Sequence, residues 1–265
     1  MAERREQRAV FGEAAEQYDA VRPGYPADLV ADVLAYAGKG PAVEVGAGTG
    51  KATVAFAAHG LELTCLEPDP RMAAVLRRNC RPYPSVSVLV ERFEAWSPDR
   101  RYGLLYSAQA WHWVDPDRRT DLAAAALAPG GALAVFGNVF LLPDRALSAA
   151  LAEVDIRYGV PADAPPHAGD PGDGDRVERD LAAEWRTMGV ADDGRFTDPV
   201  FRIYRGGRSY STAEYLDLLA SISHYRMLEP PMLERALPEL GAVLDNHGGR
   251  IDFTVVTGLA LARLG

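Results

Sequence analysis

Apolar runs and helix-spaced apolar residues alternate along the first half of the chain. The runs predict β-strands over residues 42–46, 61–67, 86–91, 102–108 and 132–138. The helix-spaced stretches predict α-helices over residues 50–60 and 70–80, and a helix followed by a turn within 119–131. Strands that alternate with helices of this length predict a parallel sheet covered by helices on both faces.

The regions on either side of this alternation are predicted to be mainly helical. Helical spacing over residues 4–20 ends at the stretch RPGYP, residues 22–26, and a second helix is expected over 27–37. Beyond Asn138 the regular alternation of strands and helices ends. Helices are expected there near 144–158, 176–188, 212–221 and 231–245, and strands at 199–207 and 251–262.

One segment of the second half, residues 161–176, is rich in Pro, Gly and Asp and predicts a mobile surface loop that contains His167. Its aspartates raise the question of calcium, but their spacing fits no EF-hand loop and prolines interrupt them. We therefore expect no metal site in this segment.

Composition narrows the class of protein. The 265 residues carry a formal net charge of -9, and no basic cluster interleaved with aromatic residues is present, so the composition disfavours nucleic acid as a partner. Two cysteines, Cys65 and Cys80, are too few for a disulfide framework or a zinc site. The start, MAERREQRAVF, lacks the apolar core of a signal peptide. The most apolar stretch is interrupted at residues 129–131, so we expect a soluble cytoplasmic protein with no membrane partner.

Three glycines at alternate positions, Gly46, Gly48 and Gly50, follow the first predicted strand directly. Open parallel sheets bind ligands at the carboxyl ends of their strands, where the next helix begins. Lys51 stands where a dinucleotide fingerprint has its third glycine, and Ala52 stands where a phosphate loop has Ser or Thr. Both phosphate-binding interpretations are therefore weak.

The stretch E-x-G-x-G-x-G from Glu44 to Gly50 resembles the first motif of class I methyltransferases that use S-adenosylmethionine. Glu67 lies 17 residues beyond Gly50, at the end of the next predicted strand. A carboxylate there can accept hydrogen bonds from both hydroxyls of a ribose. The two features together favour a site for a nucleoside.

Further stretches are similar to a broad group of small-molecule methyltransferases that includes trans-aconitate methyltransferase. They are FGEAAEQYDAVRPGYP, FEAW, SAQAWHWVDP and LAPGGAL, and they extend the resemblance over about residues 10–140. The resemblance implies a Rossmann-like α/β fold. Its seven-stranded, mostly parallel sheet would have an antiparallel last strand, helices on both faces and a helical lid.

The resemblance also divides the chain. Residues 1–26 would form a lid segment and 27–140 the cofactor-binding core. Residues 141–248 would form a variable helical substrate cap that includes a core strand near 199–207, and 249–265 would complete the sheet. The residues expected at S-adenosylmethionine are Tyr18, Arg22, Glu44, Gly46, Ala47, Gly48, Thr49, Gly50, Glu67, Pro68, Phe93, Glu94, Gln109 and Ala110.

Two positions depart from the pattern of many relatives. Arg92 stands where they have an acidic residue for the adenine amino group, and Gly103 stands where they have Asp. The adenine contact is therefore expected from backbone groups near Phe93 and Glu94.

The lid prediction rests on Phe11, Tyr18 and Arg22. By resemblance the aromatic rings close over the cofactor, and Arg22 pairs with its carboxylate, since a guanidinium matches a carboxylate fork. The alternative is an amphipathic helix that packs on the domain and leaves Arg22 solvated.

The stretch QAWHW after the fourth strand carries the candidates for chemistry. His112 is a candidate general base, and Tyr18 is a second catalytic candidate, but a structural or positioning role for His112 is the stronger alternative. Trp111 and Trp113 would wall the substrate pocket. His224 and Tyr225, on a predicted helix, line that pocket or are simply surface groups.

The expected function is direct in-line methyl transfer to a small-molecule acceptor, with no metal. Two alternatives stay open: a methyltransferase-like enzyme that catalyses another reaction, such as a cyclisation, and a non-catalytic binding module. The intact glycine stretch with Glu44 and Glu67 argues against the second alternative but not against the first.

Overall fold

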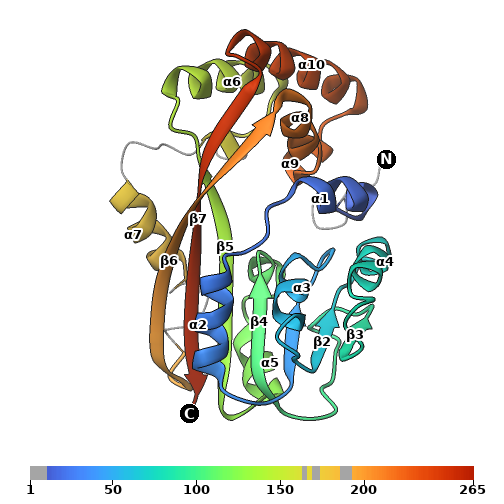
Figure 1. Ribbon diagram of the computed structural model, residues 1–265, viewed down its shortest axis with the longest axis vertical. Coiled ribbons are helices and arrows are strands. Elements are labelled where there is room, and N and C mark those ends of the chain that lie inside the picture. The colour runs from blue at the N-terminus through green and yellow to red at the C-terminus, as the bar shows by residue number, and fades with distance from the viewer. Residues whose placement is uncertain (1–10, 163–165, 169–173, 186–192) are drawn as a thin grey trace. The chain divides into compact units, whose positions relative to one another are not determined.

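A computed structural model describes residues 11–162, 166–168, 174–185 and 193–265 (Figure 1). The first part of the helix expected over 4–20, the end of the helix expected over 176–188 and most of the loop expected over 161–176 lie outside the described residues. Within the described residues the chain divides into two compact units. The sheet unit comprises 24–138, 175–204 and 257–265, and the helical unit comprises 1–23, 139–174 and 205–256.

Seven strands form one sheet in the order β3-β2-β1-β4-β5-β7-β6. Their bounds are β1 Ala42–Val45, β2 Leu63–Leu66, β3 Val86–Leu89, β4 Tyr102–Ala108, β5 Leu127–Leu141, β6 Phe196–Ser211 and β7 Arg250–Leu264. The pairs β1·β2, β1·β4, β2·β3 and β4·β5 are parallel. Within the sheet unit, β7 runs against β5 and β6 (Figure 1). The predicted fold class is therefore confirmed, with its mostly parallel sheet and reversed last strand.

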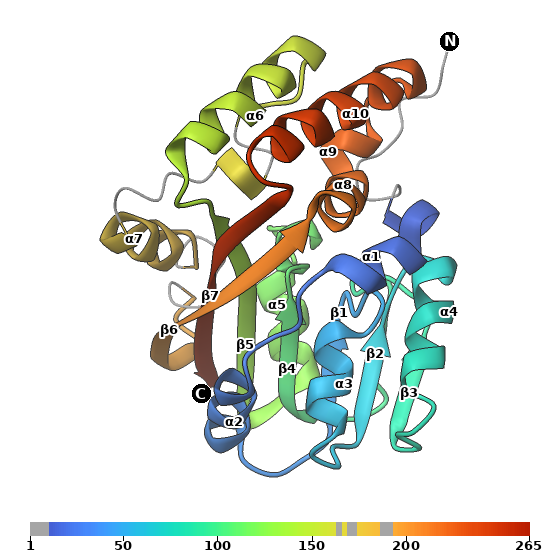
Figure 2. The same cartoon turned by 45° about the horizontal axis from the view of Figure 1, so that its top comes forward.

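The helices of the sheet unit follow the predicted positions. They are α2 Ala27–Ala37, α3 Lys51–Ala57, α4 Pro70–Asn79, α5 Arg119–Ala126 and the greater part of α7 Gly174–Trp185. Figures 1 and 2 show α2 and α3 on one face of the sheet and α5 on the other. Helix α4 begins at a proline, and Asp69 caps it by accepting a hydrogen bond from the Arg71 backbone N–H at 2.8 Å.

Strand β5 is longer than the sequence predicts. The sequence predicts a turn at residues 129–131 before the strand begins. This prediction is wrong, because β5 already begins at Leu127 and runs through these residues. The Pro-Gly-Gly stretch is instead absorbed as an irregularity in the pairing with β4, where Tyr102 faces Leu127 but Leu104 faces Ala132. A Cβ on Gly131 would lie 2.8 Å from the Ala128 carbonyl oxygen, so this irregularity requires glycine.

The core of the sheet unit contains a stack of three aromatic rings. Tyr106 lies with its centroid 4.3 Å from that of Phe56, and Phe136 lies 6.0 Å from both. All three side chains are fully buried. They join the middle strands β4 and β5 to helix α3, which begins directly after the glycine stretch.

The helical unit is built from α1 Ala15–Val21, α6 Arg145–Tyr158, α8 Thr212–Ala220, α9 Ser223–Arg226 and α10 Pro230–Asn246. Boundaries between the units fall inside β5, β6 and β7. The start of α8 carries a complete capping box, in which Ser211 and Glu214 bond each other's backbone N–H. The core of this unit includes Leu151, Tyr215 and Phe253.

The prediction that His167 lies in a mobile surface loop is wrong. His167 lies in the short 3-10 helix Pro166–Ala168 and is fully buried. Its Nε2 lies 2.8 Å from Asp155 Oδ2, and its Nδ1 contacts the Tyr215 hydroxyl. Tyr225 donates to Asp155 Oδ1 at 2.7 Å. Loop composition does not show this, because the polar partners lie on other elements.

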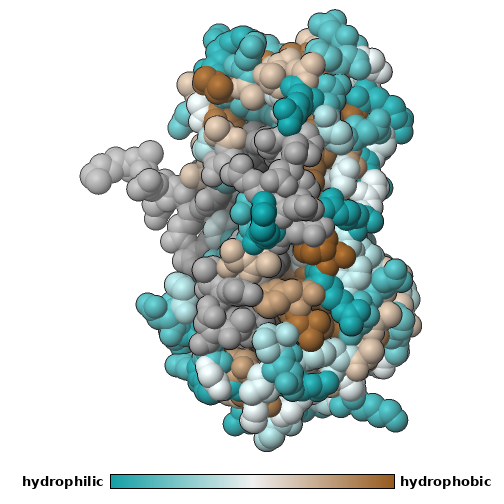
Figure 3. Space-filling model, turned by 90° about the vertical axis from the view of Figure 1, so that its left-hand side faces the viewer, coloured by the Kyte–Doolittle hydropathy of each residue, from teal (hydrophilic) through white to brown (hydrophobic). Residues whose placement is uncertain are grey.

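The surface of the described residues carries few large apolar side chains. Those that are exposed are Leu89, Val90, Ile156, Met227 and Met232. On the face drawn in Figure 3, hydrophobic residues likewise form small patches between hydrophilic ones. Among the described helices, none combines the length and the apolar character that crossing a membrane requires.

Candidate functional site

The glycine stretch forms a turn between β1 and α3 in which close packing explains two of the three glycines. Gly46 has φ +71, and a Cβ there would lie 2.3 Å from the Ala110 Cβ. Gly50 has φ +95, and a Cβ there would lie 2.6 Å from Leu76 Cδ1. The backbone N–H groups of Gly46 and Ala47 both donate to the Leu66 carbonyl, at 2.9 and 3.1 Å.

Gly48 is different, because the protein leaves room beside it. Its φ is +58, and the nearest atom to an added Cβ is Met72 Cε at 3.9 Å. Intramolecular packing therefore does not demand glycine here, although the positive φ favours it. Space beside the backbone at the start of a helix is what a ligand that approaches this backbone needs.

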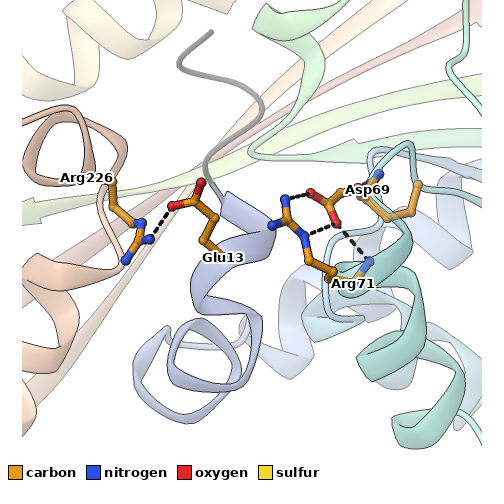
Figure 4. Close-up of polar contacts among 5 residues, drawn as sticks. Glu13, Asp69, Arg71 and Arg226 are labelled. Carbon is orange, nitrogen blue, oxygen red and sulfur yellow. Dashed lines mark hydrogen bonds and ion pairs between the residues drawn. The ribbon is translucent and has the colours of Figure 1, made fainter. Parts of the chain in front are cut away.

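Glu67 supports the same turn from the end of β2. Its Oε2 accepts a hydrogen bond from the Gly48 N–H at 2.7 Å, and its Oε1 accepts one from the Asp69 N–H at 2.9 Å. Burial raises the pKa of Glu67 to about 7, against the lowering effect of these two hydrogen bonds. Next to it, Asp69 and Arg71 form a bidentate ion pair, drawn in Figure 4, while Pro68 between the two acids is exposed.

Glu44 is 1% exposed and lies under the turn. Its Oε2 accepts hydrogen bonds from the hydroxyls of Thr53 at 2.5 Å and Tyr106 at 2.9 Å, whereas its Oε1 has no hydrogen-bond partner among the described residues. Burial raises the pKa of Glu44 to about 7, opposed by the hydrogen bonds from Thr53 and Tyr106. The hydroxyl of Thr49, in the turn itself, is also buried without a partner among the described residues.

The chain leaves β4 through an unusual backbone conformation at Gln109, which has φ +60 although it is not glycine. Its side chain donates to the Asn138 carbonyl at 2.6 Å, and its N–H donates to the Phe136 carbonyl at 2.9 Å. These contacts hold Gln109 and Ala110 beside Gly46. Gly46 and Ala110, two predicted cofactor-site residues that lie 64 positions apart, are thus brought together.

The three residues after Ala110 form a short 3-10 helix. Trp111 is 1% exposed and packs on Phe93, with ring centroids 6.1 Å apart. His112 is exposed and lies against the half-buried Trp113, with centroids 4.7 Å apart. Desolvation and the charge of Arg119 both lower the pKa of His112. The neutral imidazole, which can accept a proton, is therefore favoured at neutral pH.

The region after β3 contains the residues expected near adenine. Phe93 is buried, and Arg92 is exposed. The Glu94 carboxylate accepts the Asp115 N–H at 3.0 Å, and its carbonyl accepts from Arg118 at 3.1 Å. The carboxylate and the backbone carbonyl of Glu94 thus both have protein partners. At Gly103, a Cβ would lie 3.1 Å from the Lys39 carbonyl oxygen, so packing explains this departure from the pattern.

In the helical unit, Arg22 is held by Ser221. Its Nε donates to Ser221 Oγ at 3.1 Å, its Nη2 donates to the Ser221 carbonyl at 3.3 Å, and its guanidinium lies 5.0 Å from the centroid of the Tyr18 ring. Helix α1 is also joined to α8 by Gln17 and Asp217 at 2.6 Å. Figure 4 shows a further ion pair of this unit, between Glu13 and Arg226. Helix α1 thus packs on its unit as the alternative expects, but Arg22 is half-buried and hydrogen-bonded instead of solvated, and its pairing with a cofactor stays a prediction.

The two predicted pocket residues of α9 are placed differently from each other. Tyr225 is fully buried, and its hydroxyl bonds Asp155. His224 is half-buried. Neither is a simple surface group, and their role toward a substrate stays a prediction.

Sequence reasoning missed Thr53 and Tyr106. Thr53 reads as one more polar residue on α3, and Tyr106 reads as an aromatic residue inside a buried strand. Nothing in the spacing links Tyr106 to a glutamate 62 positions earlier. The available signal was chemical, because a buried acid such as Glu44 must find hydrogen-bond donors.

Residues 42–131 match the family model described as a methyltransferase domain. Uncharacterized methyltransferases of Mycobacterium tuberculosis and Mycobacterium bovis are each 36% identical to the chain over 135 residues, which is 51% of this chain and 54% of theirs. The chain therefore spans about half the length of the curated relatives it matches.

Solved structures extend the likeness of the fold to nearly the whole chain. A proposed type II methyltransferase from Anaeromyxobacter dehalogenans aligns with a TM-score of 0.61 and 21% identity, covering 92% of this chain and 98% of that one. A proposed methyltransferase from Bacillus halodurans aligns with a TM-score of 0.53 and 16% identity, covering 91% and 99%. Residues 42–131 therefore match a methyltransferase domain, and nearly the whole chain shares the Rossmann-like fold of these solved methyltransferase structures.

Proposed function

We propose that this protein transfers a methyl group from S-adenosylmethionine directly to a small-molecule acceptor. One observation carries the proposal: the turn at Gly46–Gly50 lies between two buried carboxylates, Glu44 and Glu67. Neither carboxylate has an ion-pair partner among the described residues. The room beside Gly48 and the unpartnered Oε1 of Glu44 and Oγ1 of Thr49 fit a polar, positively charged ligand.

The residues of the sheet unit would divide the binding. Glu67 holds the turn through one hydrogen bond to each oxygen and keeps further lone pairs for ribose hydroxyls. The negative charge of Glu44 would favour the cationic end of the cofactor. Carbonyl groups of Gln109 and Ala110 would accept from its ammonium, and backbone near Phe93 would meet its adenine.

The cofactor supplies a methyl group on a sulfonium, which is already an activated leaving group. The protein's tasks are then to align the acceptor and exclude water. His112 would position the acceptor or accept its proton, and its lowered pKa suits either role. A carboxylate acceptor needs no base, whereas a phenol or an amine does.

The acceptor would be a small molecule. A net charge of -9 disfavours the phosphate backbone of nucleic acids. Trp111 and Trp113 would line its pocket. By the resemblance, Tyr18 would cover the cofactor and Arg22 would pair with its carboxylate.

Calorimetric titration with S-adenosylmethionine and S-adenosylhomocysteine, with NADH as a control ligand, tests cofactor use. We expect micromolar binding of the first two, lost in Glu67→Ala and weakened in Glu67→Gln, which keeps one acceptor oxygen. Glu62→Ala is the matched control, because Glu62 lies near the other end of β2 and pairs with Arg100 at 2.6 Å. Absence of binding by the wild-type protein would overturn the proposal.

Transfer of labelled methyl from the cofactor to a panel of acids, phenols and amines tests the reaction. A labelled product would support methyl transfer. Consumption of the cofactor without a methylated product would instead favour the alternative of a non-methylating enzyme.

A further inference from the structure

The two oxygens of the Glu44 carboxyl group have unequal surroundings. Thr53 and Tyr106 both donate to Oε2, at 2.5 and 2.9 Å, and together they occupy its two lone pairs. The Cys65 thiol adds a weak contact to the same oxygen at 3.9 Å. All three partners are fully buried, so this arrangement is held by the core.

The other oxygen, Oε1, is buried without a hydrogen-bond partner among the described residues. No cation of the described chain pairs with Glu44 either. An ionised carboxylate in that position would be a buried, uncompensated charge, which is among the most costly groups a protein can hold. A proton on Oε1 removes the charge while Oε2 keeps both of its donors.

The other titratable groups near Glu44 also favour its protonated form. Glu67, beyond the glycine turn, and the thiols of Cys65 and Cys80 are all acidic groups. None of them would stabilise a second negative charge. Burial correspondingly raises the pKa of Glu44 to about 7.

We propose that Tyr106 is a positioning residue of the cofactor site: with Thr53 it holds Oε2 of Glu44, so that Glu44 carries a proton in a large share of the free protein near neutral pH and releases it to solvent when S-adenosylmethionine binds. The ligand carries a net positive charge, because its sulfonium and ammonium outweigh its carboxylate. Such a charge at the turn favours the ionised Glu44 without touching it, since charges interact over several ångströms in a poorly solvated site. The inference rests on the proposed function.

Proton release is measured directly by calorimetry of S-adenosylmethionine binding in phosphate and Tris buffers at pH 7. The apparent enthalpies differ by the difference in buffer ionisation enthalpy multiplied by the number of protons released. We expect wild-type protein to release about half a proton more than Glu44→Gln, because Glu44 is half protonated near this pH. Equal release by the two proteins would overturn the inference.

The role of Tyr106 is tested by the pH profile of affinity in Tyr106→Phe. The substitution keeps the ring that stacks on Phe56 and removes one donor to the ionised carboxylate, so the titration of Glu44 moves to higher pH. If it moves by about one pH unit, binding is about eightfold weaker than wild type at pH 6.5 and less than about twofold weaker at pH 8.5. A merely structural role would weaken binding equally at both pH values, and that result would contradict the proposal.

Tyr102→Phe is the matched control. Tyr102 lies in the same strand and is 1% exposed, but its hydroxyl faces Thr64 at 3.3 Å and Asp99 at 3.4 Å instead of Glu44. We expect its pH profile to follow wild type. Absence of binding by the wild-type protein would overturn the proposed function together with this inference, whereas binding with no proton release that depends on Glu44 would overturn the inference alone.

Discussion

Each of the two units contains a deeply buried carboxyl group, Asp155 in one and Glu44 in the other, and the two have different partners. In the helical unit, Asp155 is 2% exposed, lies 2.8 Å from the imidazole of His167 and accepts from Tyr225. In the sheet unit, Glu44 is 1% exposed and receives only hydroxyl and thiol donors, all on one oxygen.

The different partners of Asp155 and Glu44 indicate different roles for the two carboxyl groups. Each oxygen of Asp155 lies against a group of the protein: Oδ1 accepts from Tyr225 on α9, and Oδ2 lies 2.8 Å from the imidazole of His167. This arrangement joins α6 to the 3-10 helix and to α9. Glu44 keeps an oxygen without a partner among the described residues, directly beneath the glycine turn. A positively charged ligand at the turn would favour the ionised form of this carboxyl group.

The largest expected effect comes from removing Asp155. Asp155→Ala leaves Tyr225 buried without its acceptor and His167 buried without its charge partner, and should lower the free energy of unfolding by about 3 kcal/mol. Glu44→Gln removes no ion pair and should change it by less than about 1 kcal/mol. Urea denaturation measures both. Glu153→Ala, at an exposed position of α6, is the control for the helix, and similar losses in Asp155→Ala and Glu44→Gln would break the comparison.

A smaller effect separates glycines that the sheet unit needs for packing from the one it leaves open. Gly46→Ala places a Cβ against Ala110 and should destabilise the protein by roughly 2 kcal/mol or more, through overpacking and the positive φ. Gly48→Ala should cost only about 1 kcal/mol of stability but weaken S-adenosylmethionine binding at least about tenfold. Thermal unfolding and calorimetry measure the two effects. Unchanged affinity in Gly48→Ala would remove the space beside Gly48 from the site.

Arg22 tests whether a side chain of the helical unit also acts on the ligand. Arg22→Ala should weaken cofactor affinity about tenfold if one charge-assisted contact is lost. Ser221→Ala removes a hydroxyl partner of Arg22 without removing its charge, and should leave affinity within about twofold. Equal loss of affinity in both variants would mean that Arg22 acts by bracing α1. Unchanged affinity in Arg22→Ala would exclude the contact.

The smallest effect is the pH dependence of stability in the absence of ligand. The pKa of Glu44 is raised to about 7 in the folded protein from 4.5, so the folded state holds the proton that the unfolded state has already lost. Stability from this group is therefore fully present below pH 4.5 and is lost as pH rises from there through 7, and the last part of this fall, between about pH 6 and 8, amounts to about 1 kcal/mol. Glu67 contributes in the same direction. The fall should be smaller in Glu44→Gln than in wild type. Denaturation curves at several pH values across this range measure it. An equal fall in the two proteins would show that Glu44 does not titrate.

Much of the sheet unit could be predicted from the sequence. The strands that contain Val43, Cys65 and Leu105 follow from apolar runs, and Gly46, Gly48 and Gly50 mark the turn without any structure. These signals are local, because strand pattern, turn residues and helix caps depend on neighbours in the chain. The cofactor family followed from the same stretch, and the comparisons with known proteins agree with it.

The contacts that set the chemistry of Glu44 and Asp155 were decided by the tertiary structure alone. Tyr106 reaches Glu44 across 62 positions, and Tyr225 reaches Asp155 across 70. His167 lies in a segment whose composition predicted a mobile loop, yet it is buried against Tyr215. Composition and periodicity report how a residue relates to its neighbours along the chain. Whether a polar side chain meets a partner or is left without one depends on which distant elements pack against it.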